Sequence, residues 1–373
     1  MGSGQNRIAS LDGLRAISVG LVFLAHAAVS TGAPSWMPET YHYANLGVRT
    51  FFVISGFLIT HLLLKERERT GGIDLQAFYV RRAYRILPAA YAYMAIVTVL
   101  YFRSFSRADL VTSYLYVANY HEHHAWTLGH LWSLGVEEQF YLLWPFAAAF
   151  LFARRRLVLA LAILLAPAFR ALFFVAFGRH WTASLQGVTF WFPSVADALA
   201  TGCLLAVVRP VLDRLAPTLR SPAMLLVPLA TLALVQFQRV PGRYTGLTYE
   251  VLVIPLIHLG IALTIDHCIR RRYWLLNNAP VVFCGVVSYS LYLWQQPFLV
   301  SAQKVHGAAA PWETFPLNVL LAFGAGCLSY YLVERPVLRY RERRRSTRAL
   351  ALELLPAAAV RGIDDAGASA RSR

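Results

Sequence analysis

One residue of this sequence that could take part in chemistry is His26, which lies near the end of an apolar stretch that begins at about residue 11. Ionisable groups are costly inside apolar segments, and those that persist there usually have a function. Arg15 precedes His26 by eleven residues, which separates the two by roughly 16 Å along a helix. An imidazole is the commonest general base in proteins. His26 is therefore a candidate general base, although taken alone it fits a buried, hydrogen-bonded or interfacial histidine better, and Arg15 alone is most simply an anchor that sets the topology.

Two adjacent carboxylates, Glu137 and Glu138, lie near the start of a later apolar stretch at about residues 131–152. Neighbouring side chains on a helix point about 100° apart, so at most one of the two can face His26. A carboxylate beside an imidazole fixes its tautomer and stabilises its protonated form. Glu137 is therefore a candidate partner of His26, and the alternative is that both glutamates face water outside the membrane.

Three arginines, Arg81, Arg82 and Arg85, precede Pro88 near the start of another apolar stretch. Arg82 and Arg85 share a helix face because they are three residues apart. Guanidinium groups bind phosphates through paired hydrogen bonds, which suits a phosphorylated donor at the cytoplasmic surface. The alternative is that these arginines contact lipid headgroups.

Other polar residues within apolar stretches have simpler interpretations. Asp197 and Arg170 are charges inside the membrane that could pair with each other, line a cavity, or do both. Ser55-Gly56 and Gly202 most simply allow two helices to pack closely, because small residues let backbones approach each other.

Neither the cysteines nor the histidine-rich loop predicts a disulfide or a metal site. The four cysteines are far apart, form no CxxC motif, and lie in or beside apolar stretches, which is typical of small core residues. The loop His121-Glu122-His123-His124, with His130 nearby, has closely spaced imidazoles but no ordered ligand set. We expect no metal and no bound cofactor.

The elements that must position these residues are membrane-spanning helices. Of the 373 residues, 57% are hydrophobic and only 14% are charged, whereas soluble domains carry roughly a quarter charged residues. A soluble protein and a disordered chain are both excluded. A bilayer is crossed by about 20 apolar residues. We predict an all-α bundle of about ten spans, near residues 11–29, 46–64, 79–102, 131–152, 157–177, 187–208, 222–238, 249–268, 280–303 and 313–333.

Two further features of the chain concern its loops and its charge. The apolar run 110–119 is assigned to an outer loop, with a partial eleventh helix as the alternative.

The 35 Lys and Arg residues outnumber 19 Asp and Glu residues, giving a net charge of +16. In a soluble protein this excess would suggest nucleic acid, but in a membrane protein it marks cytoplasmic loops.

The distribution of the positive charge predicts the orientation. With the N-terminus inside, most basic residues fall in loops on the same side of the membrane, so we expect both termini in the cytoplasm. We predict a membrane domain at residues 1–340, followed by a basic, disordered cytoplasmic tail at residues 341–373. The location is the inner cell membrane, crossed many times, with no nucleic-acid partner.

Several short segments, taken in order, resemble the acyltransferase-3 family of integral-membrane O-acyltransferases. The segments are Arg7 with Leu11-Asp12-Gly13-Leu14-Arg15-Ala16 and His26, residues 47–60, Arg82-Ala83-Tyr84-Arg85-Ile86-Leu87-Pro88, residues 130–145, Ser288-Tyr289-Ser290-Leu291-Tyr292-Leu293-Trp294, and Glu334-Arg335-Pro336. The resemblance covers about residues 7–340. This chain departs from the family at Arg49, where an acidic residue is common, and at Gln295, where a histidine is usual.

The resemblance implies an enzyme that moves an acyl group from acyl-CoA, usually acetyl-CoA, to a hydroxyl of a carbohydrate, glycolipid or related acceptor. It implies that His26 is the catalytic base, Arg15 its support, and Glu137 its partner. Arg82 and Arg85 become donor-site residues. Acyl-CoA is then a co-substrate, and the acceptor and membrane lipid are the other partners.

The candidate substrate- and donor-binding residues also include Ser133 and Ser55, from two of the family-like segments, and the intramembrane Asp197. The main alternative to an enzyme is a transporter or flippase of a lipid-linked sugar, in which several spans and buried charges are equally natural. A variant of the enzyme hypothesis keeps the fold but passes the acyl group across the membrane to a protein-bound carrier.

Overall fold

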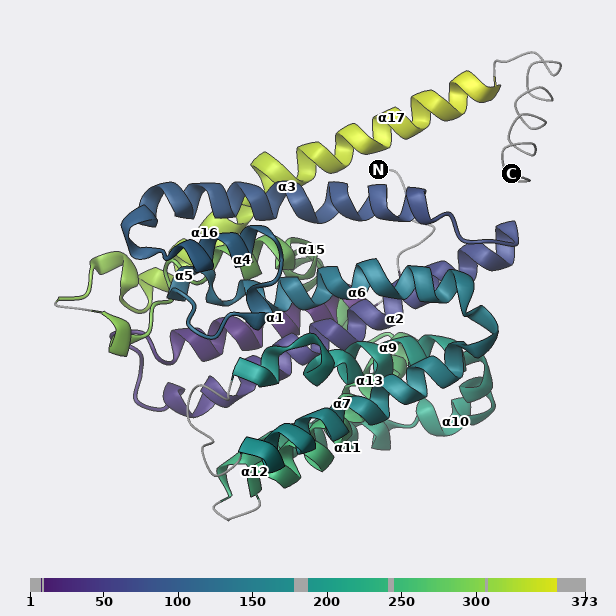
Figure 1. Ribbon diagram of the computed structural model, residues 1–373, viewed down its shortest axis with the longest axis horizontal. Helices are drawn as coiled ribbons and strands as arrows, with labels where there is room; N and C mark the ends of the chain where they lie inside the picture. The colour runs from purple at the N-terminus through teal and green to yellow at the C-terminus, as the bar shows by residue number, and fades with distance from the viewer. Residues whose placement is uncertain (1–7, 9, 178–186, 241–244, 306–307, 354–373) are drawn as a thin grey trace.

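The computed structural model describes residues 8, 10–177, 187–240, 245–305 and 308–353. This part of the chain is a helical bundle, in which most long helices lie side by side along the longest axis (Figure 1). No β-strand forms within it, and its β-pairing is limited to two isolated bridges, Ser30 with Ser301 and Thr31 with Thr314. The all-α prediction is confirmed.

The long helices follow the predicted apolar stretches. They are α1 (Leu11–Ala27), α2 (Ala44–Thr70), α3 (Leu75–Tyr101), α6 (Leu131–Phe150), α7 (Arg155–Phe177), α9 (Phe192–Leu212), α11 (Leu226–Val235), α13 (Ile254–Arg271), α15 (Ala279–Trp294), α16 (Leu317–Ser329) and α17 (Arg335–Glu353). The short helices are α4 (Arg107–Tyr114), α5 (Trp126–Gly129), α10 (Ala216–Leu219), α12 (Thr245–Thr248) and α14 (Trp274–Asn277). Two π-helical turns, Tyr249–Val253 and Tyr330–Glu334, lead into α13 and α17.

Seven helical segments of the described chain are long and apolar enough to cross a membrane, which indicates a multi-pass membrane protein. They contain α2, α3, α7, α9, α11, α13 and α16. Helix α15 is apolar but has only 16 residues. Helix α1 has 17 residues, and α6 has 20 but carries Glu137 and Glu138.

Several predicted boundaries differ from the structure. The stretch predicted at residues 280–303 is helical only to Trp294, because Pro297 disfavours a helical conformation in the residue before it and cannot continue the ladder of hydrogen bonds. The apolar run 110–119 contributes to α4, which ends at Tyr114, and to a 3-10 turn at Ala118–Tyr120, and it is too short to span a membrane. The predicted tail, residues 341–373, begins inside helix α17, and residues 354–373 lie outside the described part of the chain.

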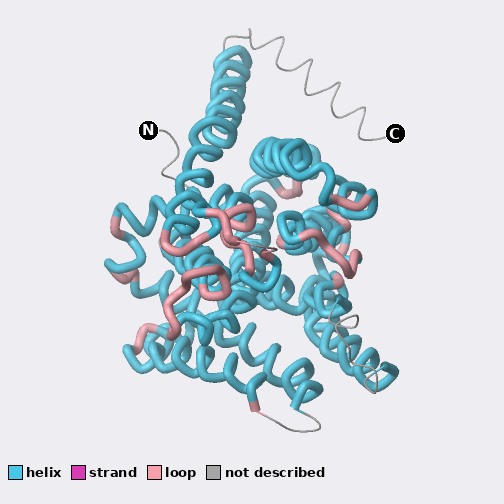
Figure 2. Tube along the Cα trace, turned by 90° about the vertical axis from the view of Figure 1, so that its left-hand side faces the viewer, coloured by secondary structure: helices cyan, strands magenta, loops and turns pink. Residues whose placement is uncertain are grey.

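The connections between successive long helices alternate between the two ends of the bundle. The loops from α1 to α2, from α3 to α6 and from α15 to α16 lie at the left-hand end of Figure 1, which faces the viewer in Figure 2. The connections from α2 to α3 and from α6 to α7 lie at the opposite end. His26, close to the end of α1, therefore lies near the first set of loops, and Arg82 and Arg85, early in α3, lie nearer the other set.

Close helix packing fixes the lateral arrangement around α2. Gly56 of α2 lies against the backbone of Leu199 in α9, and Gly202 of α9 lies against the backbone of Val53 in α2. A Cβ atom at either glycine would overlap the other helix. The prediction that Gly56 and Gly202 permit close packing is confirmed.

Candidate active site

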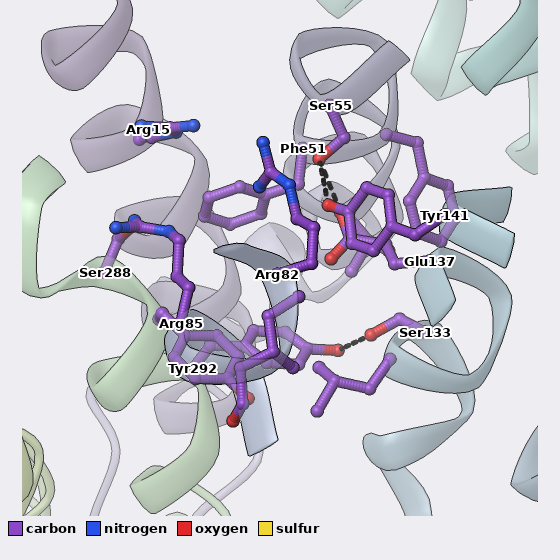
Figure 3. A pocket seen from close by; sticks show the side chains of 15 residues that line it. Arg15, Phe51, Ser55, Arg82, Arg85, Ser133, Glu137, Tyr141, Ser288 and Tyr292 are labelled. Carbon is purple, nitrogen blue, oxygen red and sulfur yellow. Dashed lines mark hydrogen bonds between the residues drawn. The ribbon is translucent and has the colours of Figure 1, made fainter. Parts of the chain in front are cut away.

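A cavity of about 90 Å³ lies inside the bundle, between α1, α2, α3, α6 and α15 (Figure 3). Six of the eight residues predicted from the sequence line it: Arg15, Ser55, Arg82, Arg85, Ser133 and Glu137. Aromatic side chains, including Phe51, Tyr141 and Tyr292, complete the wall. The cavity is thus apolar in part but presents charged groups from several helices.

Helical periodicity explains why these residues meet. Ser133, Glu137 and Tyr141 of α6 are spaced by four residues and form one stripe along the helix, because positions i and i+4 share a face. Ser288 and Tyr292 are related in the same way on α15. Tyr141 could have been added to the predicted site from its spacing to Glu137, whereas Ser288 and Tyr292 had no predicted site residue on their helix face.

Three guanidinium groups contribute the positive charge of the cavity. Arg15 comes from the first turns of α1, where its Nη1 lies 3.3 Å from Asp12 Oδ1. Arg82 and Arg85 come from α3, which is started by Asp74, whose carboxylate accepts a hydrogen bond from the Ala77 N–H at 2.9 Å. The Arg82 guanidinium lies 5.2 Å from the centre of the Tyr141 ring, a geometry that favours a cation–π interaction.

Two of these guanidinium groups keep their hydrogen-bonding capacity for a ligand. Within the described residues, neither Arg82 nor Arg85 forms an ion pair with a carboxylate within 4.0 Å. Arg81, in contrast, points to the surface and pairs with Glu66 at 3.2 Å. An anion with several oxygens would satisfy the free guanidinium donors of the cavity.

Glu137 contributes the negative charge on the opposite wall. Its Oε1 accepts a hydrogen bond from the Ser55 hydroxyl at 2.7 Å, and the Tyr141 hydroxyl donates to Ser55 Oγ at 3.2 Å. Figure 3 shows Arg15 and Arg85 on one side of the cavity and Glu137 with Ser55 on the other, with Arg82 extending between them. The site therefore separates a cationic wall from an acidic one.

A third polar group lies at the boundary of the cavity towards the α3–α6 loop. The hydroxyls of Ser133 and Tyr292 are 2.7 Å apart. Each also lies 3.1 Å from the carbonyl oxygen of His130, so one hydroxyl can donate to the other while that one donates to the carbonyl. This cluster connects the cavity to the residues that surround His26, because Tyr292 lies three positions before Gln295 in the sequence.

His26 does not line the cavity, and its hydrogen-bond partner is not Glu137. Its Nδ1 lies 2.6 Å from Gln295 Oε1, and its ring packs edge-on against Trp126, with 5.7 Å between ring centres. Glu137 is bonded to Ser55 instead. The predicted His26–Glu137 pair is therefore wrong as a direct contact: Glu137 lines the cavity with Arg15, and Arg15 lies roughly three turns before His26 on α1.

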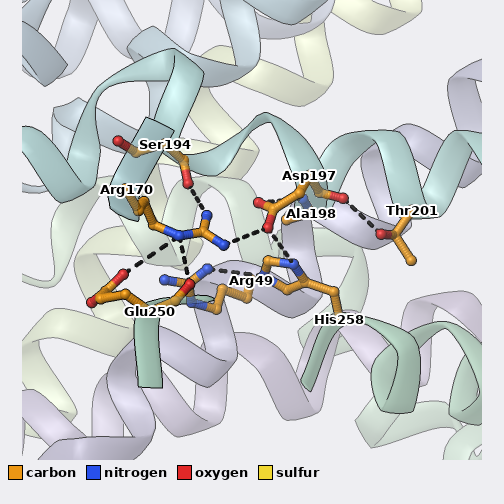
Figure 4. A network of polar contacts seen from close by, with 8 residues as sticks. All are labelled: Arg49, Arg170, Ser194, Asp197, Ala198, Thr201, Glu250 and His258. Atoms are coloured by element: carbon orange, nitrogen blue, oxygen red, sulfur yellow. Dashed lines mark hydrogen bonds and ion pairs between the residues drawn. The ribbon is translucent and has the colours of Figure 1, made fainter. Parts of the chain in front are cut away.

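Asp197 also lies away from the cavity, in a separate network of buried charges (Figure 4). Its Oδ2 lies 2.8 Å from Arg170 Nη2 and 3.4 Å from His258 Nδ1. Arg49 Nη1 lies 2.8 Å from His258 Nε2, and Glu250 O accepts from Arg170 Nε at 2.8 Å. Of the alternatives for Asp197 and Arg170, the structure shows the pair, whereas the placement of Asp197 in a donor- or substrate-binding site finds no support in this geometry.

The histidine-rich loop is held by contacts other than a metal. Within the described residues, no group of three or more His, Cys, Asp or Glu side chains is arranged to hold a metal ion. His121 Nε2 lies 3.3 Å from Asp109 Oδ1, and His124 Nε2 lies 2.6 Å from the Ala118 carbonyl oxygen. Burial acts to raise the pKa of the Asp109 carboxyl, but hydrogen bonds from Ser106 and Ala125 outweigh it, so this pKa is lowered.

Comparison with known proteins was made by family and by individual sequence. A family model described as an acyltransferase domain matches residues 8–335. Peptidoglycan O-acetyltransferase OatA of Listeria monocytogenes is 29% identical over 367 residues, covering 88% of this chain and 56% of that protein. O-acetyltransferase OatA of Staphylococcus aureus is 28% identical over 355 residues, covering 88% and 56%. The putative peptidoglycan O-acetyltransferase YrhL of Bacillus subtilis is 29% identical over 370 residues, covering 88% and 55%.

The chain spans just over half the length of each of these relatives. No solved structure matches it.

Proposed function

The chain belongs to the acyltransferase-3 family, and on this premise we propose that it is a membrane O-acetyltransferase that moves an acetyl group from acetyl-CoA to a carbohydrate hydroxyl. The observation that carries the proposal is the cavity in which Arg15, Arg82 and Arg85 face Glu137 and Ser55 within a bundle of apolar helices. Several relatives are named peptidoglycan O-acetyltransferases, which favours a peptidoglycan sugar as the acceptor.

We assign the donor to the cationic wall and proton transfer to His26. The guanidinium groups of Arg82 and Arg85 bind phosphate oxygens of the donor, and its pantetheine arm extends through the bundle towards His26. His26 Nε2 accepts the proton of the acceptor hydroxyl as the oxygen attacks the thioester carbonyl carbon. The new C–O bond forms, the C–S bond breaks, and the leaving thiolate takes the proton back from His26. A cavity poor in water limits hydrolysis of the thioester.

The remaining roles follow from the contacts within the cavity. Glu137, held by Ser55, offsets the positive charge of the arginines and orients them. Ser133, with Tyr292, contacts the donor where it passes from the cavity towards His26. Arg15 stabilises the donor's negative charge from α1, so this wall draws on three arginines from two helices.

The orientation in the membrane completes the proposal. Helices α1, α6 and α15 join the seven longer segments to give ten spans, with both termini in the cytoplasm. This orientation places Arg82 and Arg85 near the cytoplasm, where acyl-CoA is available, and His26 in the outer half of the membrane. The acceptor then enters from the outer side.

The direct test is transfer of labelled acetyl groups by the purified chain in liposomes. We expect label from acetyl-CoA to appear in a base-labile ester on soluble peptidoglycan fragments or on a lipid-linked precursor. Label that stays in acetyl-CoA, while a lipid-linked sugar crosses the bilayer, would show a flippase instead.

Replacing Arg82 or Arg85 with alanine should raise the KM for acetyl-CoA by about 10- to 100-fold, because each removes charge-assisted hydrogen bonds worth roughly 1.5–3 kcal/mol. The KM for the acceptor should change little. Lysine at either position should rescue only partly, because it lacks the planar fork of donors. Initial rates at varied donor and acceptor concentrations measure both constants.

The matched control is Arg81→Ala. Arg81 is exposed on the same helix and pairs with Glu66 at the surface, so this variant should keep the KM of the original chain. Equal changes in the donor and acceptor constants for Arg82→Ala would assign Arg82 a structural role instead.

A further inference from the structure

We propose that Gln295 is a positioning residue for His26: its amide oxygen holds the imidazole in the tautomer protonated at Nδ1 and leaves Nε2 as the proton acceptor. This inference rests on the proposed function, because it concerns the same histidine. Gln295 itself accepts no proton and touches no substrate.

The atoms in contact determine the tautomer. Gln295 Oε1 lies 2.6 Å from His26 Nδ1, and a carbonyl oxygen can only accept a hydrogen bond. The proton must therefore be on Nδ1, and in the neutral ring the lone pair is then on Nε2. His26 is half-buried, and none of its atoms is among the buried polar atoms without a partner, so Nε2 is open to an incoming hydroxyl.

Within the described residues, the Gln295 side chain makes its hydrogen bond to His26 and to no other residue. Gln295 is fully buried, with 0% of its surface exposed, at the point where α15 ends. Its Nε2 has no hydrogen-bond partner within the described residues, so the bond to His26 is the one that its side chain forms there. A buried amide that makes one hydrogen bond, to the imidazole, fits an orienting role better than a general structural one.

The next residue holds the surroundings in the same way. Gln296 Oε1 accepts from the His130 backbone N–H at 3.2 Å and lies 2.8 Å from His130 Nδ1. The carbonyl oxygen of Gln296 accepts from Trp126 Nε1 at 3.1 Å, and Trp126 packs against the His26 ring. Gln295 therefore contacts His26 directly, and Gln296 holds Trp126, the aromatic neighbour of His26, through its backbone carbonyl.

The neutral amide has a consequence for the dependence of the rate on pH. Titratable groups on this side of the bundle include His130, which interacts electrostatically with His26, and Lys304, whose ammonium lies 5.2 Å from the centre of the neighbouring Trp126 ring. Within the described residues, no carboxylate forms an ion pair with His26. A carboxylate at position 295 would stabilise the protonated imidazole, so the acidic limb of the pH–rate profile would move to higher pH.

Two substitutions of Gln295 separate orientation from packing. Gln295→Met keeps the length of the side chain but loses the acceptor, and kcat should fall about 10- to 100-fold, as when the orienting partner of a histidine ligand is lost, with the acetyl-CoA KM changed less than twofold. Gln295→Glu keeps the acceptor. It should recover most of the kcat at high pH, and the acidic limb should move up by about one to three pH units.

The measurements are kcat, KM and full pH–rate profiles of the complete chain in liposomes, beside Gln236→Glu as a matched control. Gln236 is half-buried elsewhere in the bundle and donates to Tyr43 OH, so its variant should leave the pH profile unchanged. The inference would be overturned if Gln295→Met kept the kcat of the unsubstituted chain. It would also be overturned if Gln295→Glu were as slow as Gln295→Met at every pH. Absence of transfer by the unsubstituted chain would instead refute the proposed function.

Discussion

Acetyl transfer should fall by about 100- to 10,000-fold when His26 is replaced by alanine, because that is the usual contribution of a general base. A hydroxyl is a weak nucleophile until its proton is removed, and alanine has no group to accept it. The acetyl-CoA KM should change little, since His26 lies outside the cavity that carries the arginines. Steady-state transfer from labelled acetyl-CoA in liposomes measures both quantities.

Two variants make the test of His26 specific. His123→Ala removes an exposed histidine from the α3–α6 loop and should keep the original rate. His26→Gln retains a hydrogen-bonding side chain of similar size but no base, and should be as slow as His26→Ala. A folded His26→Gln variant with a near-normal kcat would show that another group removes the proton.

The helix faces that line the cavity could be predicted from the sequence, because residues three or four positions apart share one side of a helix. Arg82 and Arg85 are three residues apart on a helix that starts near one surface, and Ser133 and Glu137 are four apart on a helix that runs the other way. A spacing of three or four residues places both members of each pair on the same face of their helix. These local rules require no knowledge of which helices are neighbours.

Lateral contacts could not be predicted in this way. His26 and Glu137 are plausible partners as ionisable residues of two apolar stretches, but α1 packs closely against both α15 and α2, and Glu137 lies near Arg15 rather than near His26. His26 therefore meets the end of α15, and Glu137 meets Ser55 of α2. Small residues allow these close contacts, because Gly285 of α15 lies against the backbone of Asp12 and Gly47 of α2 lies against the backbone of Ser18, and a single sequence does not specify the helix order.

Gln295 shows why an orienting residue is harder to find than a charged one. It carries no charge, and it lies just beyond the end of a helix, next to Gln296 and before Pro297. An uncharged amide in an apolar sequence has no pattern that identifies its partner. Its significance appears only when the distance to His26 Nδ1 is known.

The network around Asp197 gives the second large effect, which is on stability. Asp197 is 1% exposed and Arg170 is 3% exposed, and Arg170 also donates to the carbonyl oxygens of Ser194 and Glu250. Without Asp197, Arg170 keeps among the described carboxylates only the longer contact of its Nε with Glu250, at 3.6 Å, and removing one partner of a buried ion pair costs about 3–5 kcal/mol. Asp197→Asn preserves the shape of the side chain, so this loss should come from charge and not from a cavity.

The free energy of unfolding in detergent micelles, measured by denaturant titration, should thus fall by about 3–5 kcal/mol in Asp197→Asn. Asp213→Asn is the matched control: Asp213 pairs with Arg270 at 2.7 Å, but its side chain is 63% exposed, so the loss should stay below about 1 kcal/mol. Adding Arg170→Leu to Asp197→Asn should cost less than the two single losses combined, because both charges are then absent. A loss below about 1 kcal/mol for Asp197→Asn, or strict additivity of the double variant, would contradict a coupled buried pair. The result bears on function as well, because this network joins α2, which carries Ser55, to α7, α9 and α13 and so fixes the wall on which Glu137 is held.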